Sequence, residues 1–324
     1  MPRGPRSTQV WPALHHARAE APRGGTPIAV NAVAWQALDR LRPAGAGHQD
    51  RCVRDEGPYD ARVFTVVHAC LRDAAGGSPT AVLDESPMSD EERRSVPGRA
   101  GTSHAVFVAP DGGVRFFTSA GELPACGHGT VAALALLASR TGRPEQLLRV
   151  SGRTFWGRAI PIGDGLFDAA FDPGPVTTRL PDKSEMPEVL EVVAAIGAGE
   201  RAGACIATLG RPRMLLPIAD RDRLAALRPD LDRLQAATDR LGLLGCYVHT
   251  IPDAEGRATA RMFAPSIGVP EDVANANSTA CLAAHLGADL RVDMGDSLGS
   301  PATVTASAPT DGSILVGGTA AFAA

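Results

Sequence analysis

A short motif occurs twice in this chain, each time after the end of a strand-like segment. The first copy, ELPACGHGT, spans Glu122–Thr130, and the second, EDVANANST, spans Glu271–Thr279. Each follows an Arg-x-Phe segment, at Arg115 or Arg261, and each leads into an apolar run. A strand, a tight turn of small residues and a helix that begins with free backbone N–H groups together form an anion-binding site. Two such sites predict two similar halves that face each other across a cleft and hold a ligand carboxylate between two helix N-termini.

The length and charge of the chain restrict its class. A chain of 324 residues suits two domains or one pseudo-symmetric pair with a sizeable core. Its net charge is −4, with both signs mixed along the sequence, so we expect neither nucleic acid nor membrane as a partner. No apolar stretch approaches the ~20 residues of a membrane span, and the N-terminus lacks the apolar core of a signal peptide. The sequence therefore predicts a cytoplasmic protein.

The cysteines and the common catalytic motifs exclude other classes. Six cysteines occur without CxxC or Cys/His metal spacing, and such thiols are free in a reducing cytosol by default. The sequence also lacks Gly-x-Ser-x-Gly, P-loop and dinucleotide-binding fingerprints. We therefore expect no metal site, and we expect none of the activities that these three fingerprints indicate.

Composition changes divide the chain into segments. Residues 1–58 are rich in Arg, Pro and Gly and are predicted to form a partly disordered N-terminal extension. The alternative is an element that covers an edge of the fold or the cleft. We assign 59–175 to a first domain and 176–295 to a second, with 296–324 as C-terminal strands that pack back on the first domain.

Local patterns predict the elements of each half. Strand patterns lie at 61–68, 81–83, 104–108 and 114–117, then at 204–208, 213–218, 246–250 and 258–263, with a final strand at 313–322. Ser89 and Glu92 form a capping box that opens a short helix. Helix patterns occupy 220–227 and 231–241, and each motif copy begins a further helix. The predicted class is α+β: two pseudo-symmetric domains, each a curved mixed or antiparallel sheet around a central helix.

These segments occur in the order of a known family. From about Tyr59 to Ala324 the chain resembles the PhzF-like branch of the diaminopimelate epimerase fold. The matching segments are Phe64-Thr-Val with Gly77-Ser-Pro-Thr-Ala-Val, Gly101-Thr-Ser-His-Ala-Val-Phe-Val, Phe117-Thr-Ser with the first motif copy, and Phe263-Ala-Pro with Gly268-Val-Pro-Glu-Asp. The resemblance implies a two-domain fold, a homodimer, and proton-transfer chemistry on a small carboxylate without a metal or an organic cofactor.

The resemblance also assigns positions, and two of them depart from the family. It places the catalytic carboxylate of the PhzF-like branch at His104, the family histidine at His128 and the family aspartate at Asp272. One of the two thiol bases of the epimerase branch falls on Cys126, whereas the position of the second thiol holds Asn275. The chain therefore has neither the PhzF-like Glu nor the complete pair of cysteines.

Four side chains are the candidate catalytic groups. Cys126 precedes a predicted helix N-terminus, where the dipole favours the thiolate; the alternative is a small buried residue beside a turn. His128 either transfers a proton or donates to a carboxylate, unless it caps its own helix. His104 offers an imidazole where the family carries a carboxylate. Asp272 either holds a polar substrate group, orients His128, or caps the second helix.

The candidate substrate-binding residues surround these groups. Their amide and hydroxyl groups suit charge stabilisation and positioning rather than proton abstraction. They are Gly127, Gly129 and Thr130 at the first helix start, Asn275, Ala276, Asn277 and Ser278 at the second, and Ser78, which the resemblance places near the cleft. Glu122 and Glu271 recur in both copies and are predicted to anchor the turns.

The leading hypothesis is a cofactor-independent isomerase. It would catalyse a 1,3-type proton shift or double-bond migration in a small unsaturated carboxylic or amino acid, within antibiotic-type secondary metabolism. Cys126 or His104 would remove the proton, and His128 or the other member of that pair would return it. Two alternatives are open: a racemase or epimerase that uses Cys126, and a catalytically inactive binding protein that keeps the cleft.

Overall fold

The same order of strands and helices occurs twice in this fold. The computed structural model describes residues 64–193, 200–308 and 312–323, all within one unit, Ala32–Ala324. The predicted N-terminal extension, 1–58, lies outside the described residues. Within the described ranges, no helix combines the length and the apolar character that a membrane span needs.

The strands of the two halves correspond one to one around a central helix. The first half contains β1 (Thr65–Leu71), β2 (Ser78–Asp84), α2 (Asp90–Ala100), β3 (His104–Val108), β4 (Val114–Phe117), β5 (Glu122–Leu123), α3 (Gly127–Thr141), β6 (Glu145–Val150), β7 (Arg153–Gly163) and β8 (Leu166–Phe171). A connection follows with β9 (Thr177–Arg179), α4 (Glu185–Val193) and the 3-10 helix η2 (Glu200–Gly203). The second half contains β10 (Cys205–Leu209), β11 (Arg211–Ile218), α5 (Arg221–Ala226), α6 (Leu231–Arg240), β12 (Cys246–Thr250), β13 (Arg257–Ala264), η3 (Pro265–Ile267), β14 (Val269–Asp272), α7 (Ala276–Leu286), β15 (Leu290–Met294), η4 (Asp296–Leu298), β16 (Ala302–Ser307) and β17 (Leu315–Phe322).

The two halves also share the order of their strand pairings. In the first half β1 is antiparallel to β2, β2 is parallel to β3, β3 is antiparallel to β4, and β4 is antiparallel to β5. The strands from β10 to β14 repeat this order of antiparallel, parallel, antiparallel and antiparallel pairs. After the central helix, β6–β7–β8 and β15–β16–β17 each form an antiparallel meander. The predicted α+β class with two pseudo-symmetric halves is therefore confirmed.

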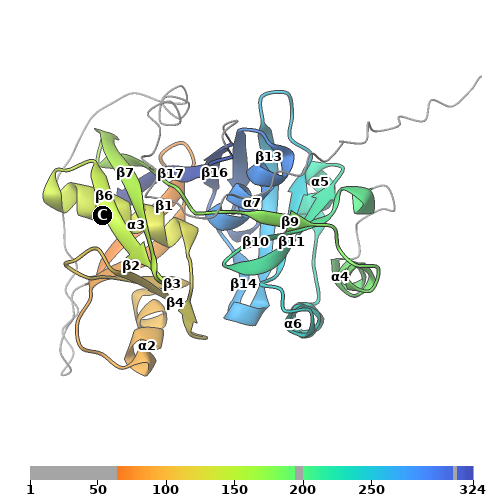
Figure 1. Ribbon diagram of the computed structural model, residues 1–324, viewed down its shortest axis with the longest axis horizontal. Coiled ribbons are helices and arrows are strands. Elements are labelled where there is room, and N and C mark those ends of the chain that lie inside the picture. Colours follow the sequence, from red (N-terminus) through yellow and green to blue (C-terminus); the bar gives the residue numbers. More distant parts are fainter. Residues whose placement is uncertain (1–63, 194–199, 309–311, 324) are drawn as a thin grey trace, which may run out of the picture. The chain divides into compact units, whose positions relative to one another are not determined.

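Strands of the first half enclose the helix α3. Its apolar residues Val131–Leu136 are all buried, and it contacts β1, β7, β8 and β17. Figure 1 shows β1, β7 and β17 around it. The sheet curves back toward itself, because Gly113, next to β4, pairs with Arg149 of β6. The backbone of β7 comes so close that a Cβ atom at Gly157 would lie 2.6 Å from the Leu134 side chain. The helix is thus a core element with strands on several sides.

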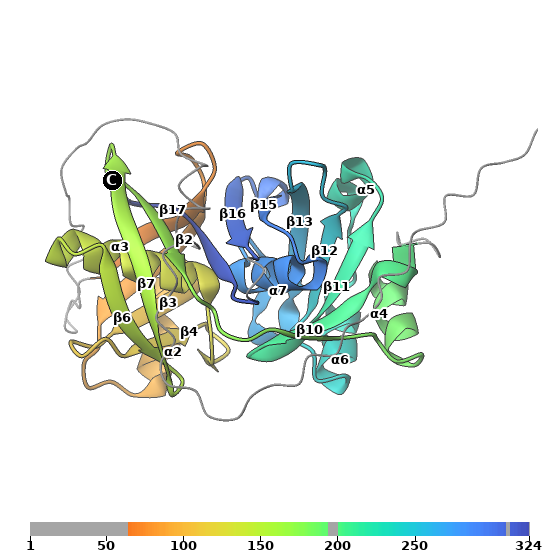
Figure 2. The same cartoon turned by 45° about the horizontal axis from the view of Figure 1, so that its top comes forward.

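The C-terminal strand β17 pairs with strands of both halves. Residues 315–317 pair with β16, whereas residues 316–321 pair with β8 and residues 319–322 pair with β1. Figure 2 shows β17 running from the neighbourhood of β16 toward the strands around α3. Backbone hydrogen bonds of this one strand therefore join the two halves.

Helices cover the outer faces of the sheets. In the first half α2 packs Val96 against the aromatic rings of β3 and β4. In the second half α4, α5 and α6 share an apolar cluster with Met214 and Leu216 of β11, whereas Leu215 belongs to the central cluster that contains α7. Successive strand residues point to opposite faces, so β11 separates the outer helices from the site-bearing helix α7.

The capping signals that the sequence predicts are present. Ser89 caps α2: its hydroxyl accepts the N–H of Glu92, and the Glu92 carboxylate accepts the N–H of Ser89 at 2.6 Å. Asp220 caps α5 at the predicted helix start. α3 ends at Gly142, whose φ of 66° is the left-handed conformation that glycine tolerates. These local signals, which depend on a few adjacent residues, are confirmed.

Several elements have no clear sequence pattern. The meander β6–β7–β8 and the helix α4 are absent from the predicted elements. The long strand β7 contains Gly157 and Pro161, residues that are depleted in strands. Its pairing with β6 on one side and β8 on the other outweighs that preference.

Replacing Leu134 with Ala should lower the free energy of unfolding by about 2–5 kcal/mol, because the enclosing strands cannot collapse onto the space that is left. The side chain is fully buried, and equilibrium chemical denaturation measures the change. Ser139→Ala, at an exposed position of the same helix, is the matched control and should change stability by less than about 0.5 kcal/mol. A loss below about 1 kcal/mol for Leu134→Ala would contradict the enclosure of α3.

Candidate active site

The N-termini of α3 and α7 meet in direct backbone contact. A Cβ atom at Gly127 would lie 2.5 Å from Cβ of Ala276 and 3.0 Å from the backbone nitrogen of Asn277. Gly127 and Ala276 hold the same position in the two motif copies. Both helix starts line one cavity, so their unpaired N–H groups are close to one another. The predicted meeting of two helix N-termini is confirmed, and it requires glycine at position 127.

Equivalent ion pairs anchor the two turns. Arg115 donates from Nε and Nη2 to the carboxylate of Glu122, at 2.8 and 2.7 Å. Arg261 donates to Glu271 in the same way, at 2.8 and 2.7 Å. Each pair joins the strand before the motif to the first residue of the motif. Glu122 and Glu271 are therefore structural anchors, as the repeat predicts.

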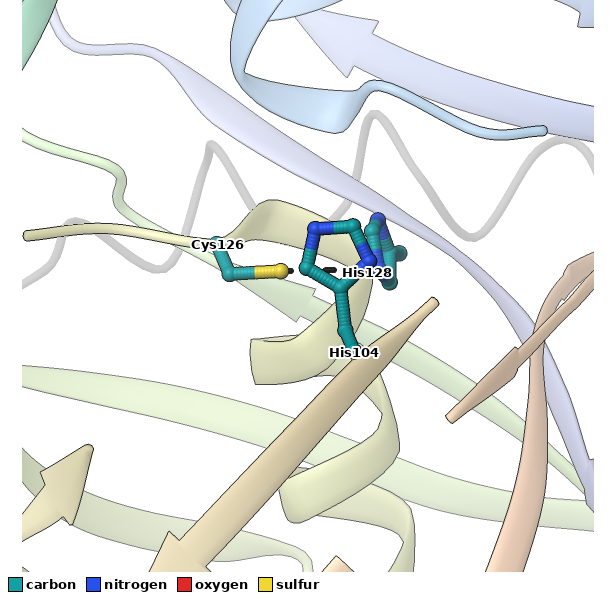
Figure 3. Close-up of side chains that lie close together, drawn as sticks. All are labelled: His104, Cys126 and His128. Atoms are coloured by element: carbon teal, nitrogen blue, oxygen red, sulfur yellow. Dashed lines mark hydrogen bonds between the residues drawn. The ribbon is translucent and has the colours of Figure 1, made fainter. Parts of the chain in front are cut away.

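Three side chains that can take up or release a proton converge at the start of α3 (Figure 3). His104 is the first residue of β3, Cys126 is the N-cap residue of α3, and His128 lies in its first turn. All three are buried, and their nitrogen and sulfur donor atoms lie within 4.8 Å of one another. Figure 3 shows the three side chains directed toward one another. Among the residues that the structure describes, this is also the set of donors close enough together to share one metal ion.

Two hydrogen bonds fix the ring of His128. Its Nδ1 lies 2.9 Å from the carbonyl oxygen of Ala274, so this nitrogen carries a proton. Its Nε2 faces Sγ of Cys126 at 3.5 Å. Burial lowers the pKa of His128, but the charges of Cys126 and Asp272 outweigh burial and raise the pKa to about 10. His128 therefore carries a proton on both ring nitrogens at neutral pH.

His104 is held in the opposite protonation state. Its Nδ1 lies 2.8 Å from Oγ of Ser103, and its ring packs edge-on against His128, with the centroids 4.4 Å apart. Burial, with the positive charge of His128, keeps the pKa of His104 well below 6.5. The imidazole is therefore neutral at pH 7. When Nδ1 donates to Ser103, Nε2 is left as a proton acceptor.

Asp272 lies behind His128. Its Oδ2 is 3.9 Å from Nδ1 of His128 and accepts a hydrogen bond from Nδ2 of Asn275 at 2.9 Å. Its Oδ1 is buried without a hydrogen-bond partner among the described residues. Burial raises the pKa of this carboxyl, while His128 and Asn275 act in the opposite direction. The cap of α7 is Asn275 rather than Asp272, and Asp272 makes no hydrogen bond to His128, so the geometry favours a role for Asp272 in keeping His128 charged.

The α7 side of the site carries groups that do not titrate. Asn275 caps the helix, because its Oδ1 accepts the N–H of Ser278 at 2.9 Å. Asn277 lines the cavity. These two asparagines hold the positions that Cys126 and His128 hold on α3. The backbone of the site is therefore symmetric, whereas its thiol and its two imidazoles belong to one half.

Sequence reasoning missed two arginines of β11. Arg211 and Arg213 line the cavity, and Arg213 is 2% exposed. Arg213 donates to the carbonyls of Leu209 at 2.5 Å and Arg211 at 2.9 Å and lies 3.3 Å from Oγ of Ser278. The sequence feature that could have indicated them is Arg-Pro-Arg, two charged residues at the start of an otherwise apolar strand, Arg211–Ile218.

Two adjoining cavities meet at Cys126 and Asn277. One, of about 40 Å³, is lined by His104, His128 and Asp272 together with the start of α7. The other, of about 260 Å³, shares Cys126 and Asn277 with it and is lined mainly by aromatic, proline and aliphatic residues. The smaller cavity holds the proton-transfer groups, and the larger has the volume for the body of a small organic acid.

The predicted binding residues are not all on the cavity walls. Gly127, Asn275, Ala276 and Asn277 line the smaller cavity, and Thr130 lines the larger one. Three others line neither cavity: Gly129 packs against Phe116, Ser278 contacts Met262 and Arg213, and Ser78 is fully buried at the start of β2 with its hydroxyl lacking a described partner. Strand register instead places Thr80 beside His104.

Known proteins are similar to this chain in sequence. The family model for phenazine biosynthesis-like proteins (PhzC-PhzF) matches residues 67–322. An uncharacterized isomerase of Deinococcus radiodurans is 28% identical over 273 residues, which cover 76% of this chain and 87% of the relative. The trans-2,3-dihydro-3-hydroxyanthranilate isomerase of Pseudomonas fluorescens is 25% identical over 240 residues, which cover 72% of this chain and 82% of the relative.

Solved structures share the fold. A predicted epimerase from Pseudomonas aeruginosa matches with a TM-score of 0.70 and 27% identity over 82% of this chain and 98% of that chain. A PhzF-family phenazine biosynthesis protein of Bacillus anthracis matches with a TM-score of 0.66 and 16% identity over 81% and 96%, respectively, which shows the fold alone. Fold, site and relatives together define an isomerase of the epimerase-like α+β class. Within that class, the chain belongs to the phenazine biosynthesis-like family, PhzC-PhzF.

Replacing Asp272 with Asn should lower the pKa of His128 from about 10 toward its ordinary value, because the substitution removes one of the two negative charges that favour the imidazolium. The proton on His128 should then be lost at lower pH than in the wild type, and NMR titration of the histidine rings measures this. His249, whose pKa burial lowers to about 4, is the internal control and should not change. An unaltered His128 titration would contradict the coupling.

Proposed function

We propose that this protein moves a proton between two carbons of a small unsaturated carboxylic or amino acid, with its own side chains as acid and base. The observation that carries the proposal is the convergence of His104, Cys126 and His128 at the contact between two helix N-termini. The relatives that are named isomerases support the class of reaction. The matched helix starts supply N–H groups for the carboxylate and for the negative charge that grows as the proton leaves.

The two histidines take different roles. The pKa of His104 is lowered and that of His128 is raised, and groups whose pKa values are driven apart form an acid–base pair. Nε2 of His104 accepts the proton from the substrate carbon, and the electrons of that C–H bond enter the conjugated system. The Cys126–His128 pair then delivers its proton to the far carbon, where a new C–H bond forms. After the product leaves, solvent removes the proton from His104 and returns one to the Cys126–His128 pair, which restores the starting state.

The location of these groups favours a proton shift between two carbons over inversion of configuration at one carbon. A two-base racemase needs a second base on the opposite face of the reacting carbon. The α7 residues that match Cys126 and His128 are Asn275 and Asn277, whose amides cannot act as bases. A proton that leaves and returns on one face moves the double bond without inverting a centre. We therefore favour isomerisation over racemisation.

The first substrate to test comes from the name of a relative. The Pseudomonas fluorescens protein is named for trans-2,3-dihydro-3-hydroxyanthranilate, an unsaturated amino acid of the proposed class. The cavity of about 260 Å³ next to Cys126 has the volume for such a ring. We place the reaction in secondary metabolism of the antibiotic type, and the phenazine-biosynthesis members of the family support this placement.

Incubation of the protein with this compound in heavy water should shift its double bond and place deuterium at a single carbon, which ultraviolet absorption and NMR measure together. His104→Gln should lower kcat by about 10²–10⁴-fold, because an amide cannot accept the proton. His104→Glu restores a carboxylate that can accept a proton and should retain more activity than His104→Gln. His285→Gln, near the end of α7 and outside both cavities, is the matched control and should behave as wild type.

Two outcomes would replace this proposal. Inversion at one carbon with no change in the double bond would identify a racemase or epimerase. Saturable binding without turnover, unaffected by Cys126→Ala, would identify a binding protein. Wild-type activity in His104→Gln would remove His104 from the mechanism and leave Cys126 as the base.

A further inference from the structure

One wall of the small cavity carries positive charge that no described carboxylate neutralises. Arg211 and Arg213 lie two residues apart on β11 and both line the cavity. Residues two apart on a strand point to the same face. Asp272 is the one carboxylate among the described residues that line this cavity, and its Oδ2 is engaged by Asn275 and lies 3.9 Å from His128.

Arg213 is a buried cation held by neutral groups. Its described partners are two carbonyl oxygens and the hydroxyl of Ser278, and its Nε has no partner. A guanidinium stays protonated in proteins. A buried charge without a counter-charge costs several kcal/mol, and the start of α7 adds partial positive charge of the same sign. The wall therefore favours an anion in the cavity.

Arg211 provides the donors that reach that anion. It is half-buried, and its one described hydrogen bond runs from Nη2 to the carbonyl of Leu243 at 3.3 Å. The remaining N–H groups of its guanidinium are uncommitted to described residues. A planar guanidinium matches the geometry of a carboxylate.

Other arginines around the site are paired. Arg115 and Arg261 bind Glu122 and Glu271. Arg153, which lines the larger cavity, pairs with Asp172 at 3.0 Å. Among the described arginines around the site, the two of β11 are therefore the ones without a carboxylate partner.

We infer that the site prefers a di-acid over a mono-acid: one carboxylate lies at the paired helix N-termini, and a second anionic group is bound by Arg211, with Arg213 supplying charge behind it. The inference rests on the proposed function, in which the first carboxylate and the reacting carbons lie beside Cys126. It makes Arg211 and Arg213 determinants of substrate specificity. Neither residue takes part in proton transfer.

Two probes of the same conjugated chain test the inference. Trans,trans-hexa-2,4-dienedioate carries two carboxylates, whereas trans,trans-hexa-2,4-dienoate carries one carboxylate and a methyl group. Isothermal titration of the full chain should show the di-acid binding at least about tenfold more tightly, since a hydrogen bond to a charged group contributes about 1.5–3 kcal/mol. Raised salt should reduce the difference.

Variants locate the second anionic group. Arg211→Met should remove the preference for the di-acid and leave the affinity for the mono-acid within about twofold, because only the second contact is lost. Arg213→Lys keeps a charge at the buried position and should retain part of the preference. Arg240→Met, on the exposed face of α6 with Glu188 as its partner, controls for the change in net charge and should bind both probes as wild type does.

Equal affinities for the two probes, an absence of di-acid binding, or an unchanged preference in Arg211→Met would overturn the inference. The titration measures binding alone, so its result does not depend on whether the protein turns the probe over. A protein that prefers the di-acid yet moves no double bond would refute the proposed reaction and keep the anion site. A protein that isomerises mono-acids without this preference would refute the anion site and keep the proposed reaction.

Discussion

The contact between the N-termini of α3 and α7 is the constraint on which the site depends. The two helix starts are close enough that any side chain at Gly127 would overlap Ala276. This contact brings two sets of unpaired N–H groups to one cavity, where they favour negative charge from both sides. It also positions Ala274, at the α7 side, to hold the ring of His128 on α3. The strand pairings, the enclosed helix α3 and the shared strand β17 all serve to keep the two starts in this register.

A symmetric backbone here carries asymmetric chemistry. Thr130 and Thr279 donate their hydroxyls to the carbonyls of Cys126 and Asn275, so the two turns use the same local bonds. The side chains that follow differ: a thiol and an imidazole on α3, two amides on α7. The arginines of β11 add a further difference, because they place positive charge on one wall only. In the proposed function, a fold with two similar halves holds its substrate from both sides and transfers protons from one.

Much of the fold was predictable where the signal was local. The capping box at Ser89 and the helix end at Gly142 depend on a few adjacent residues, and both are present. The meander after α3 was not predictable, because β7 contains residues unfavourable in strands and is held by its neighbours. Within the site, the convergence of Cys126 and His128 followed from the motif alone. Ser78, placed by resemblance, does not line either cavity, because the register of β2 and β3 sets Thr80 beside His104 instead.

The amino-acid sequence by itself determined the two turns, their anchoring glutamates, the family, and the candidate groups for proton transfer, since each depends on short segments with fixed spacing. Only the tertiary structure decided how those groups are charged. His104 and His128 are the same residue type, yet burial leaves one neutral while Cys126 and Asp272 keep the other protonated. Arg213 likewise became a functional candidate only once the fold showed it buried beside the cavity with no carboxylate among its described partners. Protonation and charge balance depend on which distant residues share a low-dielectric space, and that information exists only in the folded chain.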